Sequence, residues 1–376
     1  FPTGIYSITE LEANQRGYAT SYDNCSKVEV KKGETAVCTI TNDDKPAKLT
    51  VVKKVINDNG GTATADDFNI KLNDKELKFE LDPKSEDKYT STYISTPEVQ
   101  SNTKYILKEI DHSGYKEGTW SCKSNKDDDA RDARPLPKEQ VVAEQADKVP
   151  STSFTLSPGD DIVCTITNDD LAPKLTLVKE VNNKDLPEDL RKAKEDWTLT
   201  ATGPTTISGD GGVTSGADFK AGTYVLSETD SIPGFTSANG WSCEGATLQE
   251  GNKITLGVGD VVSCKIINES IYGKVVIEKQ TTPDGSTSSF EFNPSWSETN
   301  FSLSDGQQHD SGWLVPGQYS VSEIVPTGWE LTGIVCDDIN SGSSAAAGDT
   351  ANINLDASET VTCTFTNTQR PVTIVA

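Results

Sequence analysis

The pentapeptide Cys164-Thr-Ile-Thr-Asn168 decides the fold, because four versions of it occur along the chain with the same spacing from Cys to Asn. The others are Cys38-Thr-Ile-Thr-Asn42, Cys264-Lys-Ile-Ile-Asn268 and Cys363-Thr-Phe-Thr-Asn367. A β-strand directs successive side chains to opposite faces, so the Cys, the Ile or Phe and the Asn of each version share a face. The amide of the Asn therefore falls on an apolar face, where a polar group without a partner is costly. We expect other polar side chains to meet it there.

Two further strand-like phrases recur in step with this one. The first carries a Lys on its apolar face, and its copies are Leu49-Thr-Val51-Val-Lys53, Leu175-Thr-Leu177-Val-Lys179 and Val275-Val-Ile277-Glu-Lys279. The second has the form Tyr-x-apolar-x-Glu, and its copies end at Glu10, Glu109, Glu228 and Glu323. The residues that follow the three lysines, Lys54, Glu180 and Gln280, alternate to the outer face. Each complete unit is thus predicted to direct one Lys, one Glu and one Asn toward its core.

The spacing of the Asn markers, 126, 100 and 99 residues, predicts a tandem array of domains in a chain of 376 residues. Short alternating runs between Gly, Pro, Asn and Asp turns indicate an all-β protein. We expect immunoglobulin-like β-sandwiches arranged in a rod. Complete units are predicted at 47–170, 173–270 and 273–367.

The two ends of the chain are predicted to be incomplete units. Residues 1–42 contain the Glu and Asn phrases but lack the first strands of a sandwich. Residues 368–376 include Arg370-Pro-Val372-Thr-Ile374-Val-Ala376, which is similar to an opening strand. This segment is expected to begin a next domain or to act as a donor strand for another copy.

Two insertions interrupt the repeat. The first, at 123–150, is rich in Asp, Lys, Arg and Pro and is predicted to be an exposed loop with a helical turn near 138–146. The second, at 183–196, is predicted to form a short helix with acidic residues early. Each of these two segments is interpreted either as a solvated surface loop or as a ligand-binding loop.

The net charge of −24 argues against a nucleic-acid partner, because neutralising phosphates needs Lys and Arg. No apolar run is long enough to cross a bilayer, and no signal peptide is visible. The acidic runs Asp43-Asp44, Asp127–Asp129 and Asp169-Asp170 could hold Ca²⁺, but none has the spacing of an EF-hand loop. Solvated acidic turns are therefore expected, and no cofactor.

The eight cysteines fall as one pair in each unit. The pairs are Cys25 with Cys38, Cys122 with Cys164, Cys243 with Cys264 and Cys336 with Cys363. This regularity predicts four disulfides within domains and an oxidising, extracellular compartment. In the chain-entropy model, closing loops of this size contributes roughly 3–4 kcal/mol each. A zinc site is not expected, because CxxC spacing is absent and there are only two His.

The repeated Lys, Glu and Asn allow one reaction. Burial shifts a Lys amine and a Glu carboxyl toward their neutral forms. A neutral amine is a nucleophile, the Asn carbonyl is an electrophile, and a protonated Glu can act as general acid and base. The product would be a Lys–Asn isopeptide bond with loss of ammonia. The alternative is a Lys that reaches solvent, a Lys–Glu ion pair and an Asn that caps a turn.

These phrases resemble the Cna protein B-type and SpaA-type pilin domains, which have a prealbumin-like sandwich. The family's Gly-aromatic turn after the Glu strand is matched by Gly17-Tyr18, Gly114-Tyr115, Gly234-Phe235 and Gly328-Trp329. The resemblance implies three bonds: Lys53–Asn168 with Glu109, Lys179–Asn268 with Glu228, and Lys279–Asn367 with Glu323. Glu10 and Asn42 would form a partial site. The departure is the Cys pair in every unit, which leaves open that disulfides replace the isopeptide bonds.

The sequence therefore predicts a structural subunit or stalk of an extracellular surface fibre or pilus, either a homo-polymer or a longer tandem array. The alternative is a surface adhesin that binds a ligand through its two insertions. An enzyme is not expected, because no Ser/His/Asp or Cys/His arrangement recurs.

Overall fold

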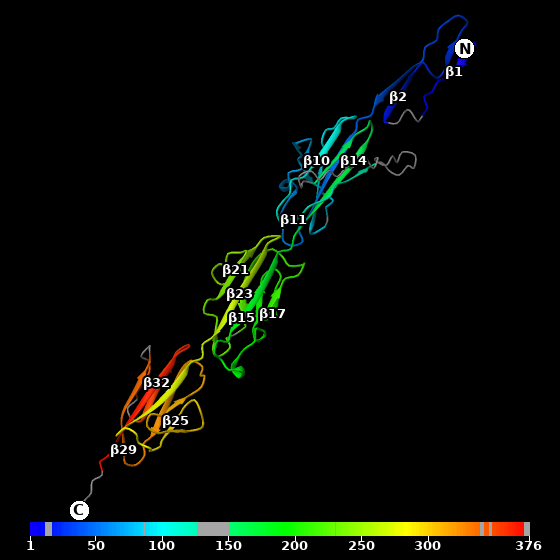
Figure 1. Cartoon of the computed structure of the whole chain (residues 1–376). Coiled ribbons are helices and arrows are strands. Elements are labelled where there is room, and N and C mark those ends of the chain that lie inside the picture. The colour runs from blue at the N-terminus through cyan, green and yellow to red at the C-terminus, as the bar shows by residue number, and fades with distance from the viewer. Residues whose placement is uncertain are drawn as a thin grey trace, which may run out of the picture.

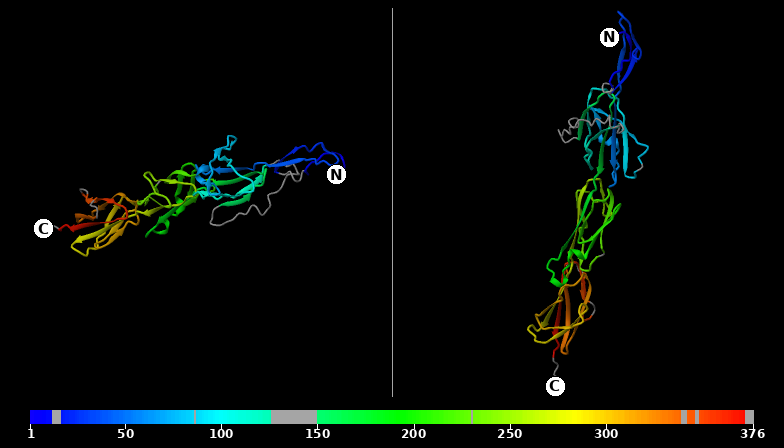
Figure 2. Two further views of the ribbon diagram at one scale, coloured as in Figure 1. Left: turned by 90° about the horizontal axis from the view of Figure 1, so that it is seen from above. Right: turned by 90° about the vertical axis from the view of Figure 1, so that its right-hand side faces the viewer.

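The computed structural model describes residues 1–11, 17–85, 87–125, 150–229, 231–338, 342–345 and 348–371. Across these ranges the regular structure is almost entirely β, which confirms the all-β class. The sheets follow one another along an elongated molecule, with the two termini at opposite ends (Figures 1 and 2). This is the predicted rod of tandem sandwiches. No helix among the described residues is long and apolar enough to span a membrane.

The first unit has two small sheets. In one, β1 (Gly4–Tyr6) pairs with β3 (Val28–Val30), and in the other β2 (Tyr18–Asp23) pairs with β4 (Thr39–Asp44). The prediction of a strand from Tyr6 to Glu10 is wrong, because the pairing of β1 with β3 ends at Tyr6. Beyond that residue Ile8 donates its N–H to the carbonyl of Cys25 at 2.9 Å, but Ile8 is 41% exposed and so is not packed in a core.

The second unit is a sandwich of two sheets, ordered β11-β14-β5-β9-β8 and β13-β10-β6-β7, with β12 added to β14. Its strands are β5 (Lys48–Ile56), β6 (Lys71–Leu72), β7 (Lys75–Glu76), β8 (Glu80–Leu81), β9 (Thr90–Ser95), β10 (Lys104–Lys108), β11 (Tyr115–Lys116), β12 (Ser121–Ser124), β13 (Ser151–Thr155) and β14 (Asp161–Asp170). A single 3₁₀ turn, η2 (Ala65–Phe68), follows β5.

The third unit repeats this plan with sheets ordered β18-β15-β23-β20 and β17-β16-β19-β22, and with β21 added to β23. Its strands are β15 (Lys174–Asn182), β16 (Thr198–Thr202), β17 (Ile207–Asp210), β18 (Gly212–Thr214), β19 (Gly222–Glu228), β20 (Phe235–Thr236), β21 (Trp241–Glu244), β22 (Lys253–Leu256) and β23 (Val261–Ser270).

The fourth unit has sheets ordered β27-β24-β32-β29 and β26-β25-β28-β31-β30. Its strands are β24 (Lys274–Thr282), β25 (Phe290–Pro294), β26 (Phe301–Leu303), β27 (Gln308–Asp310), β28 (Gly317–Ile324), β29 (Trp329–Asp337), β30 (Ser344–Ala345), β31 (Thr350–Leu355) and β32 (Thr360–Gln369).

In each complete unit the first strand pairs with the last strand in parallel. These pairs are β5 with β14, β15 with β23, and β24 with β32. The alternation that the sequence predicts is visible in β5, where Leu49, Val51, Lys53 and Val55 are buried and the intervening residues are not. Each complete unit encloses its own apolar cluster between its two sheets.

The insertion at 183–196 does not form the predicted short helix. It contains two 3₁₀ turns, η3 (Glu188–Leu190) and η4 (Lys194–Asp196). The side chain of Asn183 donates to the carbonyl of Lys192 at 2.8 Å and accepts from its N–H at 2.9 Å. These bonds close the segment as a loop, because the Asn side chain competes with helical backbone pairing.

Several predicted features lie outside the described residues. They are the helical turn near 138–146, the acidic run at 127–129 and the strand at 372–375. Docking through 370–376 therefore stays a prediction.

Candidate cross-link sites in the domain cores

The unit at 47–170 brings its Lys, Glu and Asn together. Lys53 lies in β5, Asn168 lies in β14, and Glu109 follows directly after β10. The three residues are 0%, 2% and 0% exposed, respectively. The Lys53 Nζ atom donates a hydrogen bond to Glu109 Oε1 and another, at 2.5 Å, to Asn168 Oδ1. One amine thus contacts both predicted partners inside the core.

Strand pairing explains how residues so far apart in sequence meet. In the parallel pair, Lys53 stands opposite Ile166, and Asn168 is two residues further on the same face. Glu109 approaches from the other sheet of the sandwich, to which β10 belongs. The site therefore joins the two sheets of the core as well as the first and last strands.

The unit at 273–367 has a related arrangement. Lys279 Nζ donates to Asn367 Oδ1 at 2.8 Å and to the carbonyls of Phe365 and Gln280 at 3.0 and 2.7 Å. Glu323 lies 3.8 Å from the amine, and among the described residues neither of its buried carboxylate oxygens has a hydrogen-bond partner. In this domain the Lys amine is hydrogen-bonded to the Asn, and the Glu carboxylate lies farther from the amine than the Asn does.

The unit at 173–270 differs from both. Lys179 Nζ donates to Glu228 Oε2 at 2.7 Å, and Asn268 Nδ2 donates to the same oxygen at 3.3 Å. Within the described part of the chain, Asn268 Oδ1 is buried without a hydrogen-bond partner. The carboxylate of Glu228 therefore bridges the two residues that would react.

An aromatic ring covers each amine, and the sequence interpretation did not identify it. Lys53 Nζ lies 3.5 Å from the ring centre of Phe68, Lys279 Nζ lies 4.2 Å from that of Phe290, and Lys179 Nζ lies 4.8 Å from that of Trp197. All three rings are fully buried. The available signal was an aromatic residue between each Lys phrase and the following Glu phrase. Such rings attract a cation while excluding water.

Burial changes the ionisation of these groups. It lowers the pKa of Lys53 and of Lys279 from 10.5 to about 8, against the opposing attraction of Glu109 and Glu323. Burial also lowers the pKa of Lys179, which a hydrogen bond to Glu228 opposes. The pKa values of Glu109 and Glu323 are raised by burial, against the attraction of the lysines. Both members of these pairs move toward the neutral forms that bond formation needs.

The partial site of the first unit is assembled differently. Asn42 Nδ2 donates to Glu10 Oε2 at 2.9 Å, and Thr20 Oγ1 donates to Asn42 Oδ1 at 2.6 Å. Asn42 is exposed and Glu10 is half-buried. The Glu and the Asn therefore meet even where the unit has no Lys phrase.

All four predicted cysteine pairs form disulfides, namely Cys25–Cys38, Cys122–Cys164, Cys243–Cys264 and Cys336–Cys363. In the three complete units the paired cysteines stand directly opposite each other on neighbouring antiparallel strands. One edge of the last strand is thus stapled by a disulfide, while its other edge pairs with the Lys strand.

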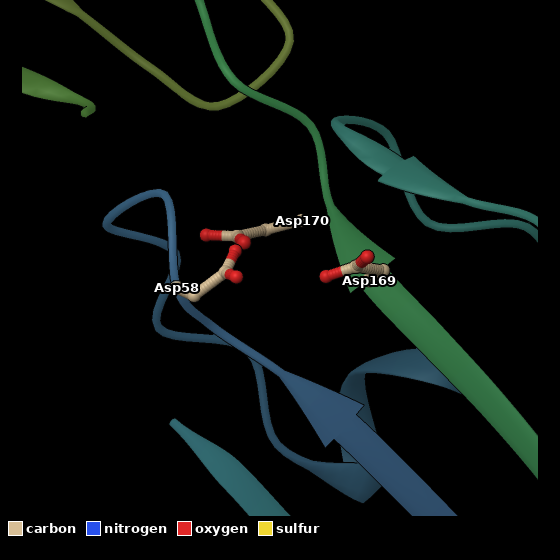
Figure 3. A group of neighbouring side chains, drawn as sticks. All are labelled: Asp58, Asp169 and Asp170. Carbon is tan, nitrogen blue, oxygen red and sulfur yellow. The ribbon is translucent and has the colours of Figure 1, made fainter. Parts of the chain in front are cut away.

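Three aspartates, Asp58, Asp169 and Asp170, gather where β14 ends, and their oxygen atoms lie within 4.8 Å of one another (Figure 3). Asp170 already accepts backbone N–H groups from Asn59 at 2.9 Å and from Gly61 at 2.6 Å. Burial and neighbouring carboxylates raise the pKa of Asp58 and of Asp169. Asp170 thus anchors the loop after β5.

Comparison with known proteins identifies the repeat. The family profile described as a prealbumin-like fold domain, of the SpaA type, matches residues 44–166 and 170–266. A second SpaA-type profile with the same description matches residues 275–369. No curated protein sequence matches the chain significantly.

Solved structures that are similar to this chain include the Bacillus anthracis TIE protein, at 12% identity and a TM-score of 0.27, with 98% of this chain and 57% of that one covered. The major pilin from Streptococcus pyogenes is 14% identical, with a TM-score of 0.31 and coverage of 53% and 99%. The pilus adhesin SpaC from Lactobacillus rhamnosus GG is 15% identical, with a TM-score of 0.26 and coverage of 92% and 46%. The chain thus spans about half the length of the first and third of these proteins.

Proposed function

This chain belongs to the SpaA-type family of prealbumin-like fold domains, and we propose that it forms the shaft or stalk of an extracellular surface fibre or pilus. Four disulfides support an oxidising location outside the cell. In this proposal the chain acts as a mechanical element, stiffened by Lys–Asn isopeptide bonds, and has no catalytic turnover.

The observation that carries the proposal is the Lys–Glu–Asn trio, which recurs in three consecutive domains and is buried except for the half-buried Glu228. Buried ion pairs are weak stabilisers, because desolvation offsets their attraction. A trio that served only stability could be replaced by apolar residues without loss. Its recurrence supports a chemical role, and Lys53 Nζ already lies 2.5 Å from the Asn168 carboxamide oxygen.

The proposed reaction is balanced within the core. The Lys53 amine attacks the side-chain carbonyl carbon of Asn168, and a C–N bond forms to Lys53 Nζ. Glu109 delivers its proton to Asn168 Nδ2 and takes one from the attacking nitrogen. The bond to Asn168 Nδ2 then breaks, and ammonia leaves. The charged amine becomes a neutral amide, so the buried ammonium and its desolvation cost disappear.

The position of the proposed bonds suits a protein under tension. Each domain is entered through its first strand and left through its last, and these strands are parallel neighbours. A bond between Lys53 and Asn168 would connect them covalently. Force would then pass from one linker to the next without extending residues 54–167. The disulfide Cys122–Cys164 lies inside that closed segment and would be shielded from the load.

Mass spectrometry of the intact protein tests the proposal. We expect the mass of the oxidised chain to be lower by one ammonia for each complete domain. Lys53→Arg is expected to restore one ammonia, after correction for the substitution, whereas Lys54→Arg at the adjacent exposed position leaves the loss unchanged. An intact mass with no ammonia lost would overturn the isopeptide proposal.

A further inference from the structure

The boundaries between consecutive domains share one hydrogen-bond pattern that is built on a single linker residue. That residue is Lys45 at the first boundary, Leu171 at the second and Ile271 at the third. Its N–H donates to the carbonyl of the glycine in the Gly-aromatic turn of the domain before it. Its own carbonyl accepts an N–H from a turn in the domain after it.

The geometry of this pattern is nearly constant. The bonds from the linker N–H to Gly17, Gly114 and Gly234 are 2.8, 2.8 and 2.9 Å long. The bonds to the linker carbonyl from Gly159, Gly259 and Ser358 are 2.8, 2.7 and 3.0 Å long. Because both backbone polar groups of one residue are engaged by two different domains, rotation about that residue breaks at least one bond.

The turn supplied by the following domain is the same in each case. It immediately precedes the last strand, and its donor residue is left-handed, with φ of 74° at Gly159, 74° at Gly259 and 58° at Ser358. The next residue closes the turn through a bond to the carbonyl three positions earlier, for example Asp260 to Gly257 at 3.3 Å. The donor N–H is therefore held in a fixed direction.

The Gly-aromatic turns come so close to the next domain, or at the third boundary to the linker, that a side chain on the glycine would collide with it. A Cβ atom on Gly17 would lie 2.1 Å from the Pro158 carbonyl oxygen, and one on Gly114 would lie 2.6 Å from that of Val258. At Gly234 the same atom would lie 2.2 Å from the ring of Tyr272. These glycines have φ of +78°, +82° and +83°, so they serve both the turn and the interface.

The fourth domain contains the same glycine without the neighbour. Gly328 has φ of +87°, its carbonyl accepts the N–H of Arg370 at 2.8 Å, and no described atom lies within 4 Å of its Cβ position. This copy separates the two roles of the glycine, because it has the turn conformation without a contact at its Cβ position. Its glycine meets the same backbone requirement, and no described atom of another domain contacts it.

We propose that the Gly-aromatic turn and the linker residue form a docking surface whose partner is the left-handed turn before the last strand of a second prealbumin-like domain. This joint holds consecutive domains in one relative orientation, where short linkers between domains otherwise permit motion. The rod is therefore kept straight by backbone hydrogen bonds that recur at each of the three boundaries. The joint involves the domain boundaries alone and does not depend on the isopeptide bonds.

Different side chains reinforce individual joints. At the second boundary Asn59 Nδ2 donates to the carbonyl of Ala217 at 3.0 Å, and Ala221 N–H donates to the carbonyl of Asn59 at 2.7 Å. At the third boundary Tyr272 packs edge-on against Phe235, with ring centres 6.2 Å apart. Since these additions differ, the shared backbone pattern is the feature that accounts for a common joint.

The test compares Gly114→Ala with Gly328→Ala in the full chain. Probes attached at the exposed positions Lys104 and Thr206, on either side of the second boundary, report the distance between the two domains by pulsed electron resonance. They are introduced through non-natural amino acids, because no described cysteine is free. We expect one narrow distance distribution in the wild type and in Gly328→Ala, and a broad one in Gly114→Ala. A Gly114→Ala distribution as narrow as that of Gly328→Ala would overturn the proposal.

A second pair of variants decides the matter if Gly114→Ala does not fold. Leu171→Pro removes the N–H that reaches Gly114 and adds no group to the Gly-aromatic turn. Arg370→Pro removes the equivalent N–H at the fourth domain. We expect a broad distribution for Leu171→Pro and a narrow one for Arg370→Pro. A narrow distribution for both contradicts the joint, while the intact mass reports independently on the isopeptide bonds.

Discussion

The Lys53 and Lys179 sites contain the same three residue types on equivalent strands, yet they differ in what the amine contacts. Lys53 reaches both Glu109 and Asn168, whereas Lys179 reaches Glu228, which in turn holds Asn268. The side chain of Glu109 is 1% exposed and that of Glu228 is 15% exposed. The Lys279 site is closer to the first type, because its amine contacts Asn367 directly at 2.8 Å.

This difference teaches that strand register and the approach of the opposite sheet are separate requirements. Register places each Lys opposite the residue two before its Asn in all three domains. The position of the Glu depends on the other sheet, where Glu228 is the last residue of β19 and Glu109 lies just beyond β10. In the 173–270 domain both Lys179 Nζ and Asn268 Nδ2 donate to Glu228 Oε2, and the amine makes no hydrogen bond to Asn268 Oδ1. We therefore expect the Lys179 bond to form more slowly.

The largest expected effect appears under mechanical load. Asn168→Ala removes the acceptor and leaves Lys53 and Glu109 as a buried pair, so the 47–170 domain should extend when the chain is pulled. Single-molecule force spectroscopy measures the extension. Thr167→Ala, at the exposed neighbouring position, is the control and should leave the domain inextensible.

The same pulling experiment compares the two sites without any substitution. If the Lys179 bond forms slowly, some freshly folded wild-type molecules should extend in the 173–270 domain but not in the 47–170 domain. Equal resistance of both domains from the earliest times would contradict the inferred difference.

The next effect concerns the disulfides. Replacing Cys122 and Cys164 by Val in the cross-linked protein should cost less than the roughly 3–4 kcal/mol expected for loop closure, because the Lys53–Asn168 bond already restrains the segment. In an Asn168→Ala background the cost should approach the full value. Chemical denaturation of the wild type, the two separate variants and their combination measures this coupling. Additive costs would indicate that no isopeptide bond closes the domain.

The third effect is the pH dependence of bond formation. The Lys–Glu pair must hold one proton, since the amine has to be neutral and the Glu protonated. The pKa of Lys53 is lowered to about 8, so the pair loses that proton as the pH rises past about 8. The rate should then fall by about tenfold per pH unit. Quenched refolding followed by mass spectrometry measures it, and a rate that keeps rising above this pH would argue against Glu109 as the proton donor.

The smallest effect is expected from the rings above the amines. Phe68→Leu should speed bond formation more than Trp197→Leu, because the ring stabilises the ammonium that must lose its proton, and the Lys53 amine is 3.5 Å from its ring centre whereas the Lys179 amine is 4.8 Å from its own. A cation–π contact contributes on the order of 0.5–2 kcal/mol, so a difference of a few fold is expected. Peptide mapping of the refolded variants measures it. Tyr105→Leu, a buried aromatic substitution in the same domain as Phe68, controls for loss of packing.

Much of the fold followed from alternation in sequence. Leu49, Val51 and Lys53 share a face in any extended strand, so the sequence alone predicted that Lys53 lies on the core side. The cysteine pairs followed from their regular spacing. The prediction of a short helix at 183–196 was wrong. Hydrogen bonds between Asn183 and Lys192 close this segment as a loop, and such bonds leave no periodic signal in the sequence.

By itself, the sequence determined which residues could meet: a repeated Lys, Glu and Asn on inward faces, and one cysteine pair in each unit. These are consequences of a strand's two-residue period, which is local to the chain. Only the tertiary structure decided how closely they meet, which ring covers each amine, and that one linker residue bonds two domains at each boundary. Those features depend on how one sheet or domain lies against another, and such long-range packing has no local pattern.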